Sequence, residues 1–414
     1  MRISHISNTD NFKGYDARPL RGVIMNKNCL GIADEIAKIG EKEGFKVFSI
    51  QGGKLVSKPP IFSSSTDALW AQDYWTILKT KLFSEHYNQK FEILKSSLDL
   101  SIDFTEKIAH QCNSSIKEYN NFLTSYLLGG IKRDQENTQN LLNLRENVNL
   151  NARKSHIQGG NLFIIKGNEK DELIIGEDDL KKFDIEDICA MYNVDKVTVL
   201  PQMDFHIDLF IRPLDNKRIL LADDNLSLDI IKDGCEKLKK IIDEYEDFRL
   251  YDLEKIYTRL LKNYIDFSEI IKCNPRAKTE EIEKTLTENG YEVIKVPGRI
   301  YKYNSPFAYS TLKHLCNYIN GLVLKNDNDE IVYITNHTNI EKILGVPKEI
   351  AEIINFNVED AFSKSIEKYV DKNHIYFVDG KQNIMSTLLT ELQGGVHCLC
   401  SEIPDTIKIK EEEI

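Results

Sequence analysis

Two cysteines stand two positions apart in the segment QGGVHCLCSEIP, which covers residues 393–404. Cys398 directly follows His397, and Cys400 comes two residues later. A cluster of this kind could bind a metal, form a redox pair, pack as small apolar side chains in a strand, or supply a nucleophile. A cysteine acts as a nucleophile in its thiolate form, beside an acid or base that handles the protons. The nucleophile hypothesis therefore requires partners elsewhere in the chain.

A metal or redox site fits this sequence poorly. Zinc sites normally add a second pair of ligands at a characteristic spacing, and the sequence contains no C-x-x-C and no H-x(3–5)-H motif. The acidic segment KNDNDE, residues 325–330, is short and lies between two expected strands, which favours a hairpin turn over a calcium loop. We therefore predict no bound metal and no cofactor.

A histidine and an aspartate alternate in the segment DFHIDLF, residues 204–210. If this segment is a strand, His206 and Asp208 point to one face and the apolar residues beside them point to the other. Burying such an ionisable pair is costly unless the pair is used in chemistry or paired with other groups. The alternative is the solvent-facing side of an edge strand.

A third candidate is Asp73, which lies between Trp70 and Trp75, the only two tryptophans of the chain. A carboxylate with aromatic neighbours is either a cap of a helix or turn, or part of a cation-binding site.

The length and composition indicate a globular protein that is large enough to form a buried hydrophobic core around these residues. The chain has 414 residues, of which 41% are hydrophobic, and a formal net charge of −11. Without a basic stripe it is not expected to bind nucleic acid. It has no apolar run of the length that spans a membrane, and residues 1–12 lack the apolar core of a secretory signal, so we expect a cytoplasmic protein. The other six cysteines are widely scattered, unlike a disulfide framework.

Hairpin, helix and strand patterns recur along the chain. The unit is recognised in four places, and a fifth would be split between the two chain ends. Repeated units of this kind favour an α/β fold in a radial, propeller-like array. The four places are residues 21–50, 159–201, 203–297 and 319–380.

Two segments depart from this repeat. Residues 77–155 and 226–288 show helical apolar spacing, and the repeat resumes after each. We therefore predict one domain, residues 1–414, with two helical insertions. Each insertion is either a structural helical hairpin or a lid or protein-binding surface.

Four motifs occur in an order that resembles a known enzyme superfamily. They are LWAQDYW (residues 69–75), GGNLFIIKGN (159–168), FHIDLFIRPLDNKRILLAD (205–223) and GGVHCLCSEIP (394–404). Together they are similar to the motif series of the guanidino-group-modifying (pentein) enzymes. The H-x-D strand and the VHC segment look most like protein-arginine deiminases, and the glycine-rich approach to Cys398 is equally similar to agmatine deiminases.

The resemblance implies a five-fold pseudosymmetric α/β propeller and a role for each motif residue. Cys398 is expected to be the nucleophile, His206 the acid and base, and Asp73 and Asp208 the two carboxylates that hold a guanidinium. The implied substrate is arginine in a protein or peptide, which would give citrulline and ammonia. Alternatives are agmatine or free arginine, amidino transfer to an amine, or an inactive pentein used as a binding module.

Three residues near the motifs qualify this prediction. By strand alternation Cys400 would share a face with Cys398, so it remains an alternative nucleophile or a resolving thiol, and His397 would point away and be structural. Leu69 stands where protein-arginine deiminases typically have an arginine that contacts the substrate backbone, which weakens the case for a peptide substrate.

Overall fold

The computed structural model describes thirteen parts of the chain, and Asp73 and Leu69 lie outside them. The described ranges are 18–26, 31–50, 76–80, 90–94, 148–151, 159–165, 171–181, 184–192, 194–244, 250–273, 278–303, 312–380 and 394–404.

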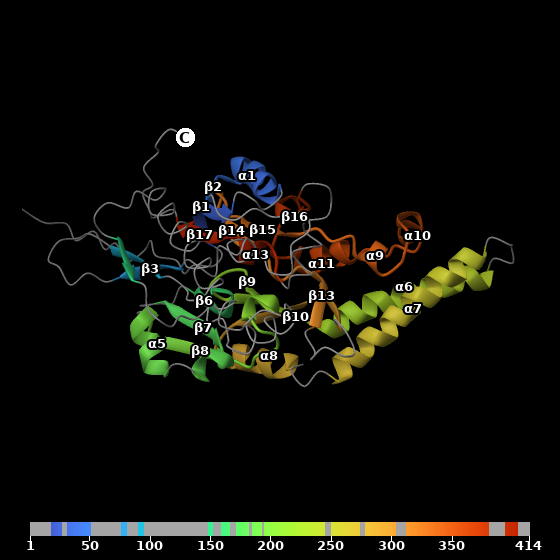
Figure 1. Cartoon of the computed structure of the whole chain (residues 1–414), viewed down its shortest axis with the longest axis horizontal. Coiled ribbons are helices and arrows are strands. Elements are labelled where there is room, and N and C mark those ends of the chain that lie inside the picture. The colour runs from blue at the N-terminus through green and yellow to red at the C-terminus, as the bar shows by residue number, and fades with distance from the viewer. Residues whose placement is uncertain are drawn as a thin grey trace, which may run out of the picture.

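One three-stranded unit occurs five times among the described strands. In each unit two strands pair antiparallel, and a third strand pairs parallel with the second (Figure 1). The five sets are β17 (Ser401–Pro404), β1 (Arg18–Asn26) and β2 (Lys46–Ile50); β3 (Thr76–Thr80), β4 (Lys90–Leu94) and β5 (Val148–Asn151); β6 (Leu162–Ile165), β7 (Glu172–Gly176) and β8 (Lys196–Leu200); β9 (Ile211–Pro213), β10 (Arg218–Ala222) and β11 (Glu292–Val296); and β14 (Leu322–Lys325), β15 (Ile331–Asn336) and β16 (Ile375–Val378).

Helices make the parallel connections in four of these units, because parallel neighbours require a long crossover. Helix α11 (Val358–Ile366) shows how such a helix begins: its first turn contains acidic residues, and the side chain of Asn357 accepts a hydrogen bond from the Asp360 backbone N–H. The crossover helices are α1 (Ile32–Glu43), α5 (Ile185–Tyr192), α8 (Thr279–Glu288), and the group α9 (Ile340–Ile343), α10 (Lys348–Ile353) and α11 (Val358–Ile366).

The unit at the chain ends is assembled from distant segments. β17 pairs antiparallel with β1, and β2 pairs with the other side of β1. β1 also pairs parallel with β14 at Arg18 and Leu324, which joins this unit to the unit of β14 to β16 in one six-stranded sheet. The unit that contains residues 21–50 is therefore the one split between the chain ends, and the additional unit is that of β3, β4 and β5.

The structure corrects the prediction of helices at several positions in residues 77–155. The described residues of this range form β3, β4 and β5, and the rest of the range lies outside the described residues. Phe91 and Leu94 have helical spacing, but both lie in β4, where pairing with β3 and β5 determines the conformation.

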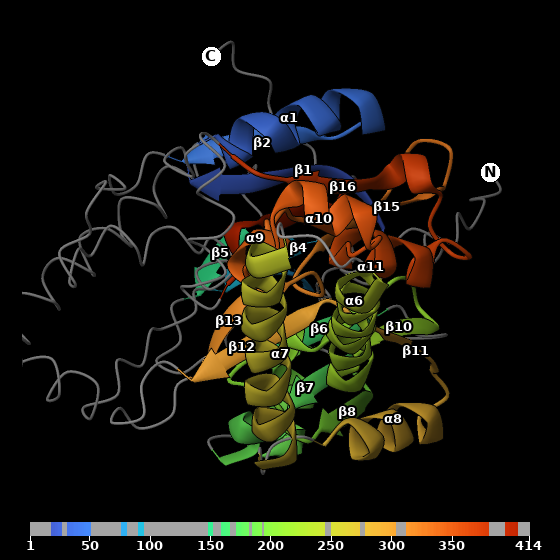
Figure 2. The ribbon, with the colours of Figure 1, turned by 90° about the vertical axis from the view of Figure 1, so that its right-hand side faces the viewer.

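The described residues between 224 and 288 form three helices. α6 (Asp224–Glu244) and α7 (Leu250–Cys273) pack side by side and extend away from the sheets, and α8 follows (Figures 1 and 2). Apolar residues such as Leu238 and Phe267 face the core, whereas ion pairs four residues apart, such as Lys237 with Asp233, cover the outer face of α6. None of the helices in the described ranges combines the length and the apolar character needed to cross a membrane.

Two segments expected as continuous strands are not strands. In residues 204–210, Ile207–Leu209 form a short 3₁₀ turn, and β9 begins only at Ile211. In residues 394–400, Val396–Leu399 form one helical turn, α13, and β17 begins at Ser401. In both cases side chains from other elements bind the backbone N–H groups that a strand would use for pairing.

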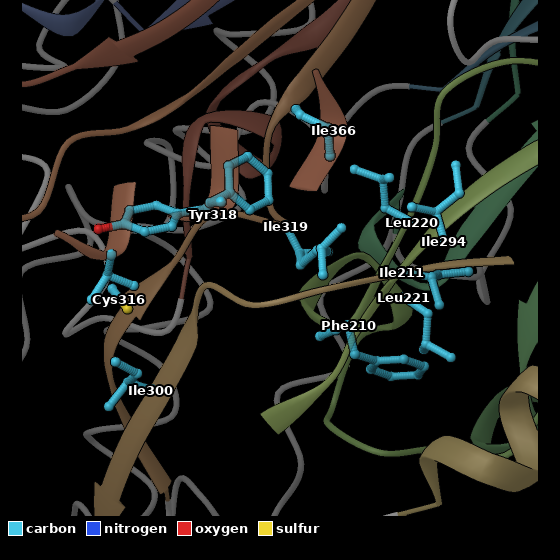
Figure 3. Packing of buried hydrophobic residues seen from close by; sticks show 14 of the residues in the cluster. Phe210, Ile211, Leu220, Leu221, Ile294, Ile300, Cys316, Tyr318, Ile319 and Ile366 are labelled. Atoms are coloured by element: carbon cyan, nitrogen blue, oxygen red, sulfur yellow. The ribbon is translucent and has the colours of Figure 1, made fainter. Parts of the chain in front are cut away.

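The main hydrophobic core joins several units. Phe210 and Ile211 pack with Leu220 and Leu221 of β10, and Ile294 of β11 lies beside them (Figure 3). β12 (Arg299–Tyr303) and β13 (Leu312–Asn317) form a separate antiparallel pair at the edge of this core. A second cluster around Val23 and Met25 contains Cys400. The segments that carry the candidate site residues are therefore fixed between two cores.

Candidate active site

The loop between β8 and β9 carries His206 and Asp208, and Asn161 anchors it. Asn161 Oδ1 accepts a hydrogen bond from the Ile207 backbone N–H at 3.2 Å and another from Gln202 Nε2 at 2.8 Å. Gln202 Nε2 also donates to the carbonyl of Phe205 at 2.9 Å. The Ile207 N–H and the Phe205 carbonyl are thus bonded to side chains and not to a neighbouring strand.

Gly160 allows His206 and Asp208 to approach the backbone closely. A Cβ atom at this position would lie 2.4 Å from His206 Nδ1 and 3.1 Å from Asp208 Oδ1, so any larger residue would displace both side chains. His206 and Asp208 are buried, at 5% and 0% exposure. The two side chains therefore lie on the same side of the loop, although no strand places them there.

Asn320 fixes the helical turn that carries Cys398. Its side-chain oxygen accepts a hydrogen bond from the Cys398 backbone N–H at 3.3 Å, and its carbonyl accepts one from the His397 N–H at 3.2 Å. Its side-chain nitrogen donates to the carbonyl of Asp208 at 3.3 Å. One asparagine thus connects both halves of the site.

Asp208 brings the two halves into direct contact. Its Oδ2 atom lies 3.5 Å from Cys398 Sγ and 2.8 Å from His397 Nδ1. An ionised carboxylate only accepts hydrogen bonds, so the thiol and the imidazole nitrogen are the donors. Residues separated by almost 190 positions in the sequence therefore form one contiguous cluster.

His397 corrects the sequence prediction, which placed it on the opposite face from Cys398. In a strand, neighbouring side chains point in opposite directions, but in a helical turn they are only about 100° apart and can reach the same carboxylate. Its position directly before Cys398 was the one available signal. The sequence prediction also gave no role to Asn161, although it lies in the motif GGNLFIIKGN, or to Asn320, which nothing local distinguishes from an asparagine in a turn.

Burial controls the protonation of both histidines. Desolvation lowers the pKa of His206 to about 4, although the charge of Asp204 acts in the opposite direction. Desolvation, with the nearby charge of Arg212, lowers the pKa of His397 well below its ordinary value. Both imidazoles are therefore neutral near pH 7 when no substrate is bound.

A buried cation lies next to this cluster. The Arg212 guanidinium stacks over the Phe163 ring at 5.4 Å, and Phe163 lies 5.7 Å from the His397 ring. Arg212 Nη2 is 3.3 Å from Glu402 Oε1, so the pair joins β9 to β17 immediately after Cys398. Both charges are almost completely buried.

Cys400 is separated from these contacts by its environment. It is 1% exposed and packs in the apolar cluster with Val23 and Met25, whereas Cys398 contacts Asp208. Asp73, the other expected carboxylate, lies outside the described residues. Within the described part of the chain, no group of three or more His, Cys, Asp or Glu side chains is arranged to hold a metal ion.

The arrangement provides a thiol, a carboxylate beside it and a neutral histidine nearby. A thiolate at the Cys398 position would be repelled by ionised Asp208, so the pair favours the thiol until a cation lies between them. The cluster is therefore suited to a positively charged electrophile with N–H groups for the carboxylate.

No protein-family model matches this chain, and no curated protein sequence matches it. Among solved structures, agmatine deiminase of C. jejuni is similar, with a TM-score of 0.47 and 11% sequence identity over 96% of both chains. A cysteine-to-serine variant of agmatine deiminase from C. jejuni with substrate bound is also similar, with a TM-score of 0.45 and 10% identity over 96% of both chains.

Proposed function

We propose that this protein is a guanidine deiminase that hydrolyses a C–N bond of a guanidinium through a covalent intermediate on Cys398. The observation that carries the proposal is the 3.5 Å contact between Cys398 Sγ and Asp208 Oδ2, with His206 beside Asp208 at Gly160. A carboxylate adjacent to the nucleophile can bind two N–H groups of a guanidinium and hold its central carbon in front of the sulfur. The five repeated units support a pentein-type propeller as part of this proposal.

The first chemical step forms a bond between Cys398 Sγ and the guanidinium carbon. The bound cation offsets the repulsion from Asp208 and stabilises the thiolate. One nitrogen then leaves as ammonia after His206 donates a proton, and an amidino group remains on the sulfur. His206 is neutral near pH 7 in the free protein, so it must take up a proton before it can donate one. The Cys398 thiol, which loses its proton when the sulfur attacks, can supply it.

The second step releases the product. Neutral His206 accepts a proton from water, and the oxygen of that water bonds to the amidino carbon. The carbon–sulfur bond breaks and a ureido product leaves, while the hydroxyl proton of the adduct returns to the sulfur as the thiol. The proton on His206 passes through solvent to the released ammonia, which leaves the histidine neutral again. His397 donates to the same Asp208 oxygen that contacts Cys398, which orients the carboxylate during both steps. In this proposal Asp73 supplies the second carboxylate of the guanidinium site.

The proposed substrate is a small guanidine such as agmatine. Cys398, His206 and Asp208 are all at most 6% exposed, which suits a slim ligand that enters a buried site. Leu69 supplies no charged group for a peptide backbone, so the protein-arginine substrate that the motifs first suggested has less support. Both structural neighbours are agmatine deiminases by name.

The test is release of ammonia and a ureido product from agmatine, free arginine and an arginine-rich protein. We expect turnover of a small guanidine by the parent, none by Cys398→Ala, and retained turnover by Cys400→Ala, because Cys400 packs in the core. Full turnover by Cys398→Ala would disprove the nucleophile, and preference for the protein substrate would disprove the substrate class.

Two other functions would give different results in the same assay. An amidinotransferase would form a new guanidine when an amine is added, in place of ammonia and a ureido product. A binding module without activity would release neither product and would not be labelled at Cys398 by a guanidine-directed alkylating reagent.

A further inference from the structure

A buried group of charges lies behind the loop that carries His206. Arg299 of β12 binds the carboxylate of Asp224, the first residue of α6, through two hydrogen bonds of 2.9 and 2.7 Å. Tyr301 donates a third bond to Asp224 at 2.7 Å. Arg299 and Asp224 are 2% and 4% exposed, so this pair forms a fixed support within the core.

Asp204 connects this support to the loop. One oxygen of its carboxylate lies 2.9 Å from His314 Nε2 on β13 and 3.8 Å from Arg299 Nη1. The other oxygen accepts a hydrogen bond from the Phe205 backbone N–H at 2.9 Å. This bond ties the carboxylate to the residue directly before His206, whose ring centroid lies 4.5 Å from that of Phe205.

Asp204 remains ionised in this environment. Desolvation raises the pKa of Asp204, but the combined effect of His314, Arg299 and the Phe205 N–H lowers it below its ordinary value. Among the described residues, the charged or titratable groups near His206 include Asp204 and Asp208 of its own loop and His397 of α13. Asp208 already accepts from His397 and Cys398, which leaves Asp204 as the carboxylate that is not engaged in the proposed guanidinium site.

We propose that Asp204 is a positioning residue that holds His206 in place and favours its protonated form when the amine leaves; this rests on the proposed deiminase function. Asp204 does not touch the reacting atoms, and its effect passes through His206. Desolvation of the imidazole lowers the pKa of His206 to about 4, and the negative charge of Asp204 acts in the opposite direction. His314 and Arg299 keep the carboxylate in the required direction.

The direct test is an NMR titration of His206 in protein with labelled histidine, with the signal assigned from a His206→Gln variant. In Asp204→Asn we expect the pKa of His206 to fall by about one, because a neutral amide no longer favours the imidazolium. Asp204→Glu retains the charge and should restore a value close to that of the parent. This measurement does not depend on catalysis.

The kinetic test compares the pH profiles of ureido product release. A decrease of one in pKa means about tenfold less imidazolium, so turnover by Asp204→Asn should fall about tenfold, with recovery in Asp204→Glu. His314→Gln keeps the charge of Asp204 but removes its partner, and an intermediate loss is expected. The control is Asp215→Asn, since Asp215 also pairs with an arginine and caps backbone N–H groups, but in the β9–β10 turn.

The two proposals fail in different ways. If the parent forms no ureido product, the deiminase function is wrong, and the titration still tests the effect of Asp204 on His206. If the product forms but His206 titrates identically in the parent and in Asp204→Asn, the role of Asp204 is wrong. An equal loss in Asp204→Glu and Asp204→Asn would also contradict it.

Discussion

At the scale of single residues, Gly160 is a position where one methyl group should disable the site. The Cβ of an alanine would overlap His206 and crowd Asp208, so both side chains must move. We predict that Gly160→Ala loses most of its activity and about 1–3 kcal/mol of stability. Urea unfolding and ureido product release would measure the two effects.

Gly290→Ala is the matched control for Gly160→Ala. Gly290 has a φ of 91°, so alanine there is strained, but no other group lies within 4 Å of the added carbon. This variant should lose stability and keep its activity. Normal turnover in Gly160→Ala would show that the approach of His206 to the backbone is not needed.

The buried histidines should make the protein sensitive to acid. The pKa of His206 is about 4 in the fold and about 6.5 in the unfolded chain, so between these pH values only the unfolded chain binds the proton. The free energy of unfolding should therefore fall by about 3 kcal/mol as the pH falls from 6.5 to 4. His397 acts in the same direction.

Urea unfolding at several pH values would measure this slope, and His206→Gln should reduce it. His337 acts in the opposite direction, because Glu359 raises its pKa, so its contribution is present below pH 6.5 and is lost as the pH rises above it. An identical pH slope in the parent and in His206→Gln would contradict the burial of a neutral His206.

At the scale of elements, Asn320 connects the turn α13 to the loop of Asp208. Asn320→Ala leaves the buried Cys398 N–H and the Asp208 carbonyl without this partner. We predict a loss of about 1–3 kcal/mol in stability and a strong loss of activity, since Cys398 would no longer be fixed beside Asp208. Unfolding by urea and the rate of Cys398 alkylation would report both.

Asn357→Ala provides a control of the same residue type. Asn357 caps α11, so its loss should cost about 1 kcal/mol without changing turnover. If both asparagine variants lose activity equally, the effect of Asn320 reflects general destabilisation and not the position of Cys398.

The turn α13 and the loop that carries Asp208 explain how much of the site the sequence could predict. Motif order selected Cys398, His206 and Asp208 as candidates, and the structure brings the segments of all three together. Strand alternation failed for His397, because Asn320 holds residues 396–399 as a helical turn. Such long-range side-chain bonds leave no periodic signal in the sequence.

At the scale of the whole molecule, the ion pair of Arg212 and Glu402 joins β9 to β17, the strand that follows Cys398. Removal of one charge from a buried pair leaves the other charge in the core. We predict that Glu402→Gln destabilises the protein by about 3 kcal/mol. Asp233→Asn, which breaks an exposed pair on α6, should cost less than about 1 kcal/mol.

A double-mutant cycle with Arg212→Met tests this assignment. If the cost arises from an uncompensated charge, the double variant should be more stable than Glu402→Gln alone. Strictly additive losses in urea unfolding would show that the two residues act independently.

The repeat of the whole molecule was only partly visible in the sequence. The units with long apolar strands, such as β6 with β7 and β14 with β15, were recognised because buried strands form continuous apolar runs. The unit of β3, β4 and β5 was missed, since short strands with polar residues match a helical spacing as well as a strand.

The split unit also sets the order in which the protein can mature on the ribosome. β1 ends at residue 26 and its partner β17 begins at residue 401, so 401 − 26 − 1 = 374 residues lie between them. At about 5–20 residues per second, β1 waits roughly 20 to 75 s for this partner. Cys398 is made in the same late segment, so β17 can cover β1 only after Cys398 has been added to the growing chain.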